Sequence, residues 1–439
     1  MIIRFTVSNF LSFKEETEFN MLTGDIKRHP HHVYKHPNVD VLRAAAIYGA
    51  NGAGKSNLIK AIDFLKRLVL GENILNSYQK FKLSKEFSNK PSELGIEFDI
   101  NGVVYAYGIV FNYEIVLEEW LCKVTFDKED ELIFTRHTDE NKVSKLNFNE
   151  KYLQTEKDKY FLEFYEKELL VSTNSFISTV KNEDFGEILI IKEWFLKNIV
   201  FVLPDFRPSQ MFGTLFIQPE LRELYSEMMA KFDTGLKSIH FKKQALEDFD
   251  YNLLNKTSLE SLEKMFKEDQ KKIRVETKKK SVHIYSYENG KIFINELIGH
   301  HGEGDDTVEF GLDEESDGTI RLLDYLTIFF LLSIEDTIFI IDEIDQSIHP
   351  SLLKTFLKTL MELNTTKGQV IFTTHESNLL DLEIFRQDEI WFAEKNNEGA
   401  TQLYPLSDFK PRYDLDIRKG YLNGRFGAIP FLADLEKTI

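Results

Sequence analysis

The chain has 439 residues, a formal net charge of −18 at pH 7 and a single cysteine, Cys122. This length allows two or three domains with large cores, and one cysteine excludes an internal disulfide. The negative charge argues against a protein whose whole surface binds nucleic acid, because it would repel phosphates at long range.

The opening MIIRFTVSNF has no cationic stretch followed by a long apolar one, so nothing in it marks the chain for export. No apolar run approaches the roughly 20 residues that a membrane helix requires. The richest runs, LTIFFLLSI and TIFIIDE, are short or end in carboxylates. We therefore expect a cytosolic protein without a membrane partner.

Residues 1–150 are expected to form a first lobe. Alternating apolar and polar residues in IIRFTVSNF and TEFNML predict paired strands. A weakly patterned strand at about 45–48 leads into a helix after Lys55, where apolar residues share one face. From about 94 to 134 the pattern returns to strands, and an Asn-Gly pair in GIEFDINGVVYAYGIVF predicts a tight hairpin.

Residues 151–280 read as a mainly helical insertion, because apolar and charged residues interleave in segments such as KYFLEFYEKELL and SLESLEKMFKEDQKKI. Residues 281–439 are expected to form the second lobe. Its pattern gives a hairpin, a helix at about 319–333, the buried strand TIFIID, a helix after Pro350, and the further strands QVIFTT and EIWFAE. This alternation predicts an α/β fold with a mostly parallel sheet, plus the antiparallel strands of the first lobe.

The stretch GANGAGKSN, residues 49–57, has the Gly-x-x-x-x-Gly-Lys-Ser spacing of a phosphate-binding loop between a strand and a helix. Its glycines let backbone amides converge on a β-phosphate, Lys55 reaches the β- and γ-phosphates, and Ser56 is a ligand of Mg²⁺. The candidate nucleotide-binding residues of this loop are Gly49, Asn51, Gly52, Ala53, Gly54, Lys55, Ser56 and Asn57. The cofactors predicted here are ATP and Mg²⁺.

A second motif, TIFIIDEID, places Asp342 and Glu343 at the end of an apolar strand. Asp342 is the candidate that supports Mg²⁺, and Glu343 the candidate that polarises the attacking water. A plain strand end would also explain the pair. A two-metal nuclease cluster of Asp342, Glu343 and Asp345 is another interpretation.

Two weaker motifs also contain residues that could contact a phosphate. In EESDGTIRLL, the residues Ser316, Gly318 and Thr319 lie before a helix and offer donors to an anion, although an ordinary helix cap has the same pattern. In FTTHESN, His375 follows a buried strand, where an imidazole could touch a γ-phosphate or serve only the structure.

The order of these motifs resembles the ABC-type ATPase heads of the RecF, SMC and OLD group. The resemblance implies that Ser-x-Gly is the signature motif, that Asp345 lies in the D-loop, and that His375 is the switch histidine. It covers the chain outside the insertion, and NFLSFKE (residues 9–15) is similar to the opening of those heads near the adenine pocket. No Q-loop glutamine can be placed.

A narrower likeness concerns AAIYGANGAGKSNLIKAI, ESDGTIRLLDY, IDEIDQSIHP, FTTHESNLLD and the C-terminal LSDFKPRYDLDIRKGYLNGRFGAIPF. These segments resemble the stand-alone ATPases of bacterial anti-phage cassettes, the group of AbiL, PtuA and AriA. The resemblance implies a sensor that controls a separately encoded effector, often a nuclease, with a phage protein or nucleic acid as a further candidate partner. No toprim-like module follows, so nuclease activity within this chain is not expected.

In ABC-type heads, the phosphate loop and the signature motif of one chain face different directions. The resemblance therefore implies a homodimer or larger assembly in which Ser316 and Gly318 complete a neighbour's site. Two other functions stay open: a RecF-like or SMC-like ATPase that binds DNA directly, and a nucleotide-gated scaffold with negligible turnover.

Three remaining features have competing interpretations. The basic run of Lys271, Lys272, Arg274, Lys278, Lys279 and Lys280 could contact nucleic acid or be a solvated helix face. The histidines His29, His31, His32 and His36 could suggest zinc, but lack cysteine partners, so a solvated polar loop is favoured. The terminal NGRFGAIPF is expected to dock as a packed tail, and a partner-binding role stays open.

Overall fold

The computed structural model describes residues 1–181, 185–204, 209–232, 234–248, 273–278, 281–302, 306–362 and 368–429, with single positions at Leu262, Lys264 and Phe266. These residues form two compact units. The first comprises residues 1–201, 332–344 and 356–439, and the second comprises 202–331 and 345–355. The unit boundaries do not coincide with the lobe boundaries expected at 150 and 280.

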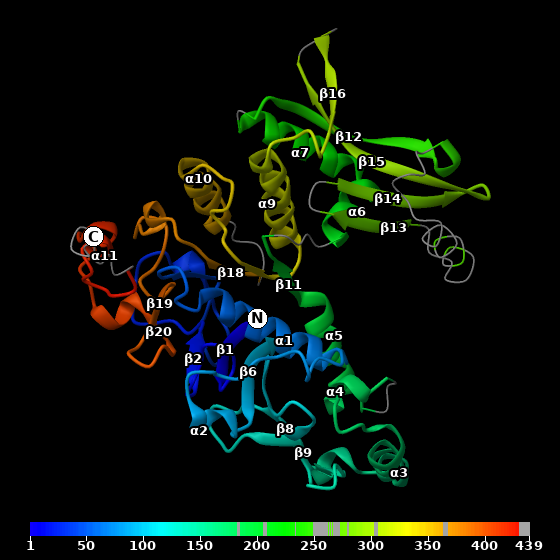
Figure 1. Ribbon diagram of the computed structural model, residues 1–439, viewed down its shortest axis with the longest axis vertical. Coiled ribbons are helices and arrows are strands. Elements are labelled where there is room, and N and C mark those ends of the chain that lie inside the picture. The colour runs from blue at the N-terminus through cyan, green and yellow to red at the C-terminus, as the bar shows by residue number, and fades with distance from the viewer. Residues whose placement is uncertain are drawn as a thin grey trace. The chain divides into compact units, whose positions relative to one another are not determined.

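A six-stranded sheet is the core of the first unit, in the order β11-β17-β18-β5-β19-β20. Its strands are β5 (Ala44–Tyr48), β11 (Ile199–Val202), β17 (Ile338–Ile341), β18 (Gln369–Thr373), β19 (Ile390–Lys395) and β20 (Thr401–Pro405). Strands β17, β18, β5 and β19 run parallel, and β20 is antiparallel to β19 (Figure 1). Every residue of β5, β17 and β18 is buried, as parallel strands covered on both faces require.

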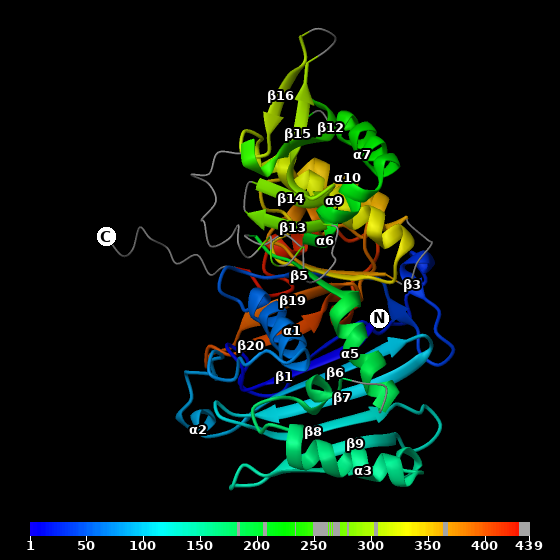
Figure 2. The same ribbon diagram turned by 90° about the vertical axis from the view of Figure 1, so that its right-hand side faces the viewer.

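A seven-stranded sheet, in the order β10-β9-β8-β7-β6-β1-β2, is the second layer of this unit. Its strands are β1 (Ile2–Ser8), β2 (Thr17–Asn20), β6 (Ser92–Ile100), β7 (Val103–Phe111), β8 (Val116–Lys123), β9 (Glu131–Thr138) and β10 (Ser144–Phe148). Neighbouring strands are antiparallel, and Figure 2 shows β6 to β9 side by side. The predicted hairpin turn has φ of 53° at Asn101 and 87° at Gly102, the positive pair that a tight primed turn needs.

Gln369, at the start of β18, connects the two sheets through its side-chain amide. Its Oε1 accepts a hydrogen bond from the amide of Ile2 at 2.7 Å, and its Nε2 donates to the carbonyls of Ile2 and Leu42, both at 2.9 Å. The side chain is fully buried, so it satisfies three backbone groups that water cannot reach.

The first unit also contains α-helices. They are α1 (Lys55–Val69), α2 (Lys85–Ser88), α3 (Glu156–Phe164), α4 (Phe176–Thr179), α5 (Gly186–Asn198) and α11 (Ile417–Leu422); α10 (Pro350–Met361) begins in the second unit. A two-stranded ribbon pairs β3 (Val33–Tyr34) with β4 (Val41–Leu42). In α1 the residues Leu58, Ile62 and Leu65 are buried on one face, as predicted.

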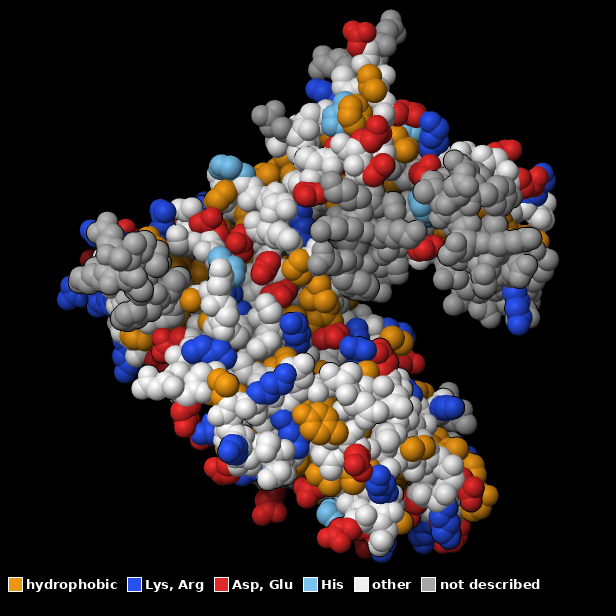
Figure 3. Space-filling model, in the orientation of Figure 1, with side chains coloured by type: hydrophobic (Ala, Val, Ile, Leu, Met, Phe, Trp, Pro, Cys, Tyr) orange, Lys and Arg blue, Asp and Glu red, His pale blue; other side chains and the backbone are white. Residues whose placement is uncertain are grey.

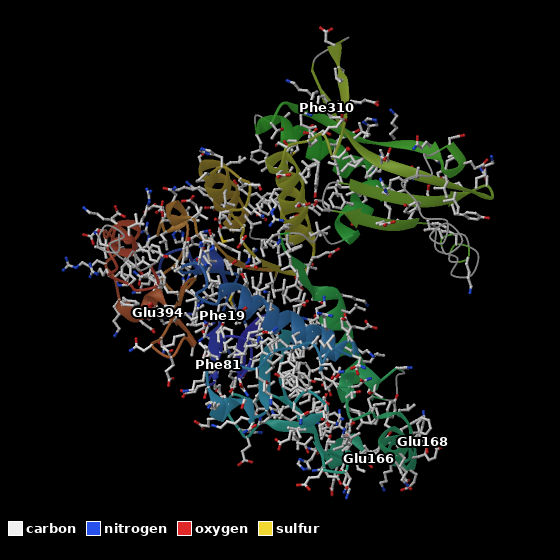
Figure 4. All side chains as sticks on the ribbon, in the orientation of Figure 1. Phe19, Phe81, Glu166, Glu168, Phe310 and Glu394 are labelled. Atoms are coloured by element: carbon white, nitrogen blue, oxygen red, sulfur yellow. The ribbon has the colours of Figure 1, made fainter. Side chains whose placement is uncertain are left out.

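The C-terminal segment packs as expected over its described part. Phe426 is buried and stacks on Phe392 with ring centroids 6.0 Å apart. Glu394, labelled in Figure 4, accepts a hydrogen bond from the amide of Ala428 at 2.9 Å. Pro430 and Phe431 lie outside the described residues.

The second unit contains a sheet in the order β12-β15-β14-β13, with β16 also paired to β15. Its elements are α6 (Ser209–Ile217), α7 (Pro219–Lys231), β12 (Leu236–Ala245), β13 (Ile273–Lys278), β14 (Ser281–Glu288), β15 (Lys291–His301), β16 (Val308–Gly311) and α9 (Asp317–Ile334). The expectation of a mainly helical insertion at 151–280 missed the strands β11, β12 and β13. In β12 the apolar Ile239 and Phe241 alternate with the polar Ser238, His240 and Lys242, a period of two that suits a strand.

Candidate functional site

The loop 49–54 connects the buried strand β5 to the N-terminus of α1. Gly54 is the residue before the helix and has φ of 111°. A Cβ added to Gly54 would collide with the hydroxyl of Thr401, and one added to Gly49 would collide with the carbonyl oxygen of Ala393. Only glycine fits at these two positions, because neighbouring strands press against the loop backbone. The first amides of α1 therefore point out of a rigid turn, an arrangement that suits a phosphate.

Lys55 begins α1 and is 5% exposed. Its Nζ donates hydrogen bonds to the carbonyl of Gly49 at 2.7 Å and to that of Ala50 at 3.3 Å. The two ring nitrogens of His375 lie 3.2 and 3.3 Å from the same Nζ. The loop and the exposed histidine at the end of β18 thus meet at one ammonium group.

Asp342 joins the phosphate loop to the end of β17. Its Oδ1 accepts hydrogen bonds from Ser56 Oγ at 3.0 Å and from Thr373 Oγ1 at 2.6 Å. A serine hydroxyl and a carboxylate side by side are the oxygen ligands that Mg²⁺ takes beside a nucleotide. The hydroxyl of Ser56 and the carboxylate of Asp342 are therefore suitable ligands for Mg²⁺.

Glu343 follows with φ of 53°, a left-handed conformation that is unusual for a residue with a side chain. Its backbone amide donates to Thr373 Oγ1 at 2.8 Å, which fixes this conformation from the neighbouring strand. The side chain is only partly buried. Such strain in a partly exposed acid, beside a candidate Mg²⁺ ligand, is typical of a functional residue.

Two polar residues that were not named as site candidates from the sequence, Ser12 and Thr401, form hydrogen bonds around the loop. Ser12 Oγ accepts hydrogen bonds from Asn57 Nδ2 at 2.7 Å and from Thr401 Oγ1 at 2.8 Å. Thr401 Oγ1 also lies 2.8 Å from the carbonyl of Ala53. Ser12 belongs to the quoted NFLSFKE stretch, whereas Thr401 on β20 and Thr373 on β18 carry no local sequence signal.

Asn9, from the same stretch, has a structural role instead. Its Nδ2 donates to the carbonyls of Phe87 and Lys90 at 2.7 and 2.9 Å, and its Oδ1 accepts from the amide of Phe81 at 3.2 Å. The residue is buried with φ of 49°. It ties the turn after β1 to the segment before β6.

A cleft of about 590 Å³ borders the loop at Ser12 and Asn57. Five cationic side chains contribute to its lining: Lys60, Arg67, Lys80, Lys82 and Lys395. Aromatic residues line it too, including Phe81, which is labelled in Figure 4. Burial lowers the pKa of the Lys80 and Lys395 amines and raises the pKa of the Asp63 carboxyl in the same cleft. A cationic cleft with aromatic walls suits an anionic, ring-containing ligand.

The signature candidates lie in the second unit, as does Asp345. Ser316 precedes α9, and its Oγ accepts a hydrogen bond from the amide of Thr319 at 3.0 Å and lies 2.8 Å from the Thr319 hydroxyl. It is the cap of α9, which begins at Asp317, two residues earlier than expected. Ser316 is nevertheless exposed, so its side chain is accessible.

The histidine segment at residues 29–36 differs from the solvated loop that was favoured. His32 and His36 are 2% and 6% exposed. His32 Nδ1 lies 3.0 Å from both carboxylate oxygens of Glu389, and His36 Nε2 lies 3.4 Å from Asp99 Oδ1. The polar sequence predicted a solvated loop, but the imidazoles of His32 and His36 are each buried against an acid that is distant in the sequence.

Of the basic run, Lys271, Lys272, Lys279 and Lys280 lie outside the described residues. Arg274 and Lys278 belong to strand β13 rather than to a helix. The same part of the chain includes Leu262 and Phe266, which pack with Leu246, Tyr285 and Ile294 in a small apolar cluster.

Comparison with known families decides the classification. The family described as "AAA domain, putative AbiEii toxin, Type IV TA system" matches residues 44–381. The chain belongs to this family. The matched range contains the phosphate loop, Asp342, Glu343, Thr373 and His375, whereas Ser12 and Thr401 lie outside it.

The chain has the predicted α/β fold class, with a mostly parallel core sheet and an antiparallel sheet in the same unit, which confirms this part of the prediction. No curated protein sequence matches the chain. Among the described residues, no helix has both the length and the apolar character needed to cross a bilayer.

Solved structures with some likeness include SMC heads. The SMC head domain from Thermotoga maritima is 13% identical, with a TM-score of 0.38, over 92% of this chain and 98% of that one. An SmcHead bound to the C-winged helix domain of ScpA gives 15% identity and 0.43, over 93% and 99%. An Smc head with an extended coiled coil, bound to the C-terminal domain of ScpA derived from Pyrococcus furiosus, gives 15% and 0.40, over 97% and 99%.

Proposed function

We propose that this chain is the ATP-hydrolysing subunit of an anti-phage defence system, in which it senses infection and controls a separately encoded effector through ATP-dependent assembly. The observation that carries the hydrolytic part is the shared contact at Asp342, whose Oδ1 accepts from Ser56 and from Thr373. That contact joins the phosphate loop, the acidic strand end and the histidine strand in one cluster.

The residues of the cluster divide the chemistry among them. The amides of loop 49–54 and the ammonium of Lys55 bind the phosphates, and Ser56 and Asp342 would hold Mg²⁺. When bound, Mg²⁺ neutralises charge on the phosphate oxygens. Glu343 takes the proton of the attacking water, and His375, in contact with Lys55 at 3.2 Å, orients that water at the γ-phosphate. The cationic cleft beside Asn57 receives the nucleoside half.

The assembly part of the proposal rests on where the motifs lie. The phosphate loop belongs to the first unit, and the exposed Ser316 with Gly318 belongs to the second. We infer that these two residues, with Thr319 and Asp345, complete the nucleotide site of another copy. ATP then stabilises the assembly and hydrolysis releases it.

Complementation between two inactive variants tests this sharing. Lys55→Ala removes phosphate binding. Ser316→Arg blocks the surface that the chain would contribute to the nucleotide site of another copy. If residues are shared, a mixed dimer contains one intact site, so mixing the inactive proteins restores part of the ATPase rate. If each chain completes its own site, the mixture stays inactive. Asp313→Arg, which adds the same side chain at an exposed position of the same loop, is the control and should keep its activity.

The assembly itself is measured with Glu343→Gln, which keeps the shape of the acid but cannot accept the proton. We expect hydrolysis to fall by about 10²–10⁴-fold while ATP binding persists. Sedimentation of this variant with ATP should show a larger species than without nucleotide. An identical sedimentation profile in both conditions would contradict the assembly proposal.

The effector part is tested on the native complex. Purification of the chain from its own cell should recover a second protein in constant proportion, and its release should depend on ATP turnover. The Glu343→Gln variant should retain that protein after ATP is added, whereas the unchanged chain should release it. Recovery of the chain alone would remove this part and leave the ATPase part standing.

A further inference from the structure

Three histidines that play no part in the nucleotide site converge at the turn before β3. His31 and His32 lie in a short 3-10 helix, Pro30–His32, and His29 is the residue before it. One ring nitrogen from each of the three lies within 4.8 Å of the others. The ring centroids of His31 and His32 are 4.4 Å apart and nearly perpendicular, while His29 stacks on His32 at 4.8 Å.

In two of these rings, one nitrogen makes a hydrogen bond that orients the ring and leaves the second nitrogen for a ligand. His32 Nδ1 lies 3.0 Å from both oxygens of the buried Glu389, and His29 Nε2 lies 2.8 Å from the carbonyl of Leu382. Histidines that bind metals almost always donate one ring N–H to a carboxylate or a backbone carbonyl, which fixes the tautomer. This leaves Nδ1 of His29 and Nε2 of His32 for a ligand.

The third ring supplies a buried nitrogen. His31 Nε2 is inaccessible to solvent and has no hydrogen-bond partner in the described part of the chain. Oε1 of Glu362 lies 3.9 Å from this nitrogen. The carbonyl of His31 accepts a hydrogen bond from Arg43 Nη1 at 3.4 Å, and this contact holds the backbone of the turn.

We propose that His29, His31 and His32 form a binding site for a divalent transition-metal ion of the zinc class, with Glu362 or a water as fourth ligand. Three imidazoles and one oxygen are a ligand set that zinc accepts. Tetrahedral zinc with nitrogens at about 2.1 Å holds them roughly 3.4 Å apart, so the turn needs to tighten by about 1 Å.

The site would connect segments that are distant in sequence. His29 to His32 lie in the loop between β2 and β3, whereas Leu382 and Glu389 lie between His375 and β19. A bound ion would fix the N-terminal loop to the chain that follows the switch histidine. This inference uses no residue of the nucleotide site and does not depend on the proposed function.

A second cluster, of two histidines and one glutamate, is less suitable. His240, His300 and Glu309 also bring possible ligand atoms together in the second unit. There, however, Lys242 donates to Glu309 at 2.7 Å, so a cation already neutralises the carboxylate. In the first cluster the buried carboxylate instead supports a ligand ring.

The experiment is a Zn²⁺ titration of the full chain without an affinity tag, by calorimetry, in excess Mg²⁺ and without nucleotide. The unchanged chain should bind a single equivalent, and His31→Ala and His29→Ala should each weaken the affinity at least tenfold. His137→Ala is the matched control, because that side chain is 72% exposed and belongs to neither histidine cluster. Circular dichroism confirms that each variant is folded.

Two further measurements identify the ligands. Co²⁺ in place of Zn²⁺ should give the intense visible bands of a four-coordinate ion, and His31→Cys should retain binding while adding a near-ultraviolet thiolate-to-cobalt band. Glu362→Gln distinguishes carboxylate from water as fourth ligand. The site is overturned if the chain binds no Zn²⁺, if His137→Ala loses as much affinity as His31→Ala, or if His31→Cys gives no thiolate band.

Discussion

Thr373 fixes both acidic residues of the candidate site with a single hydroxyl group. Its Oγ1 donates to Asp342 at 2.6 Å and accepts from the amide of Glu343 at 2.8 Å. The residue is fully buried, so no water can replace these bonds. It is therefore a positioning residue, which acts on the proposed reaction through the orientation of Asp342 and Glu343.

Thr373→Val removes the hydroxyl while keeping the shape of the side chain. We expect the ATPase rate to fall by about 10–100-fold, since loss of a supporting hydrogen bond next to a metal ligand has this effect. ATP affinity should change little, because Lys55 and the loop amides remain. Thr337→Val is the control, a buried threonine that precedes β17. Equal losses of rate in both variants would indicate general destabilisation instead.

The glycines of the phosphate loop differ in what surrounds them. Gly54→Ala places a methyl group against Thr401 and Ser12, whereas Gly52→Ala, at φ of 77°, meets no atom within 4 Å. Gly52→Ala should therefore cost only the left-handed conformation, about 1–2 kcal/mol of unfolding free energy. Gly54→Ala should cost more than that and should abolish nucleotide binding. Urea unfolding and ATP titration measure the two effects, and equal stability losses would contradict the packing argument.

At the scale of elements, the side chain of Gln369 holds the two sheets of the first unit together. Gln369→Leu leaves the amide and carbonyl of Ile2 and the carbonyl of Leu42 without their partner. Each buried unsatisfied group costs about 1–3 kcal/mol, so the variant should lose at least about 2 kcal/mol of unfolding free energy. Gln402→Leu, at an exposed position on β20, should change it by less than about 0.5 kcal/mol. Urea unfolding compares them.

The elements that sequence predicted well are those with a strong local pattern. Strands β17 and β18 are continuous apolar runs, α1 has one apolar face, and the Asn101-Gly102 turn has its own chemistry. Strand β12 was missed because it contains three lysines, Lys237, Lys242 and Lys243, which resemble the charged surface of a helix. Pairing with β15 decides its conformation, and that contact is between segments far apart in the chain.

The same limit applies to the candidate site. The loop, Asp342, Glu343 and His375 could be named because the spacing of each motif reflects its chemistry. Thr373 and Thr401 could not, since their roles come from strands that meet only in the folded sheet. The buried pairs of His32 with Glu389 and of His36 with Asp99 could not be predicted for the same reason.

At the scale of the whole molecule, charge separates the proposed sensor from an ATPase that works on DNA. The chain carries 72 acidic and 54 basic residues. On the face seen in Figure 3, blue and red side chains are interspersed rather than gathered into areas of one sign. A protein that binds duplex DNA through phosphates needs a cationic surface, and its affinity falls steeply with salt.

We therefore expect duplex DNA to change the ATPase rate by less than twofold, even at low ionic strength where phosphate contacts are strongest. Replacement of Lys278, Lys279 and Lys280 by glutamate should leave the rate with DNA unchanged, because under the sensor proposal this basic run contacts no DNA phosphate. A DNA-dependent ATPase would behave otherwise: its rate would rise with DNA, the rise would decline linearly in log salt, and the triple variant would lose it. Rates measured with and without DNA, at two salt concentrations and for both proteins, distinguish these outcomes, because only phosphate contact predicts that all three changes occur together.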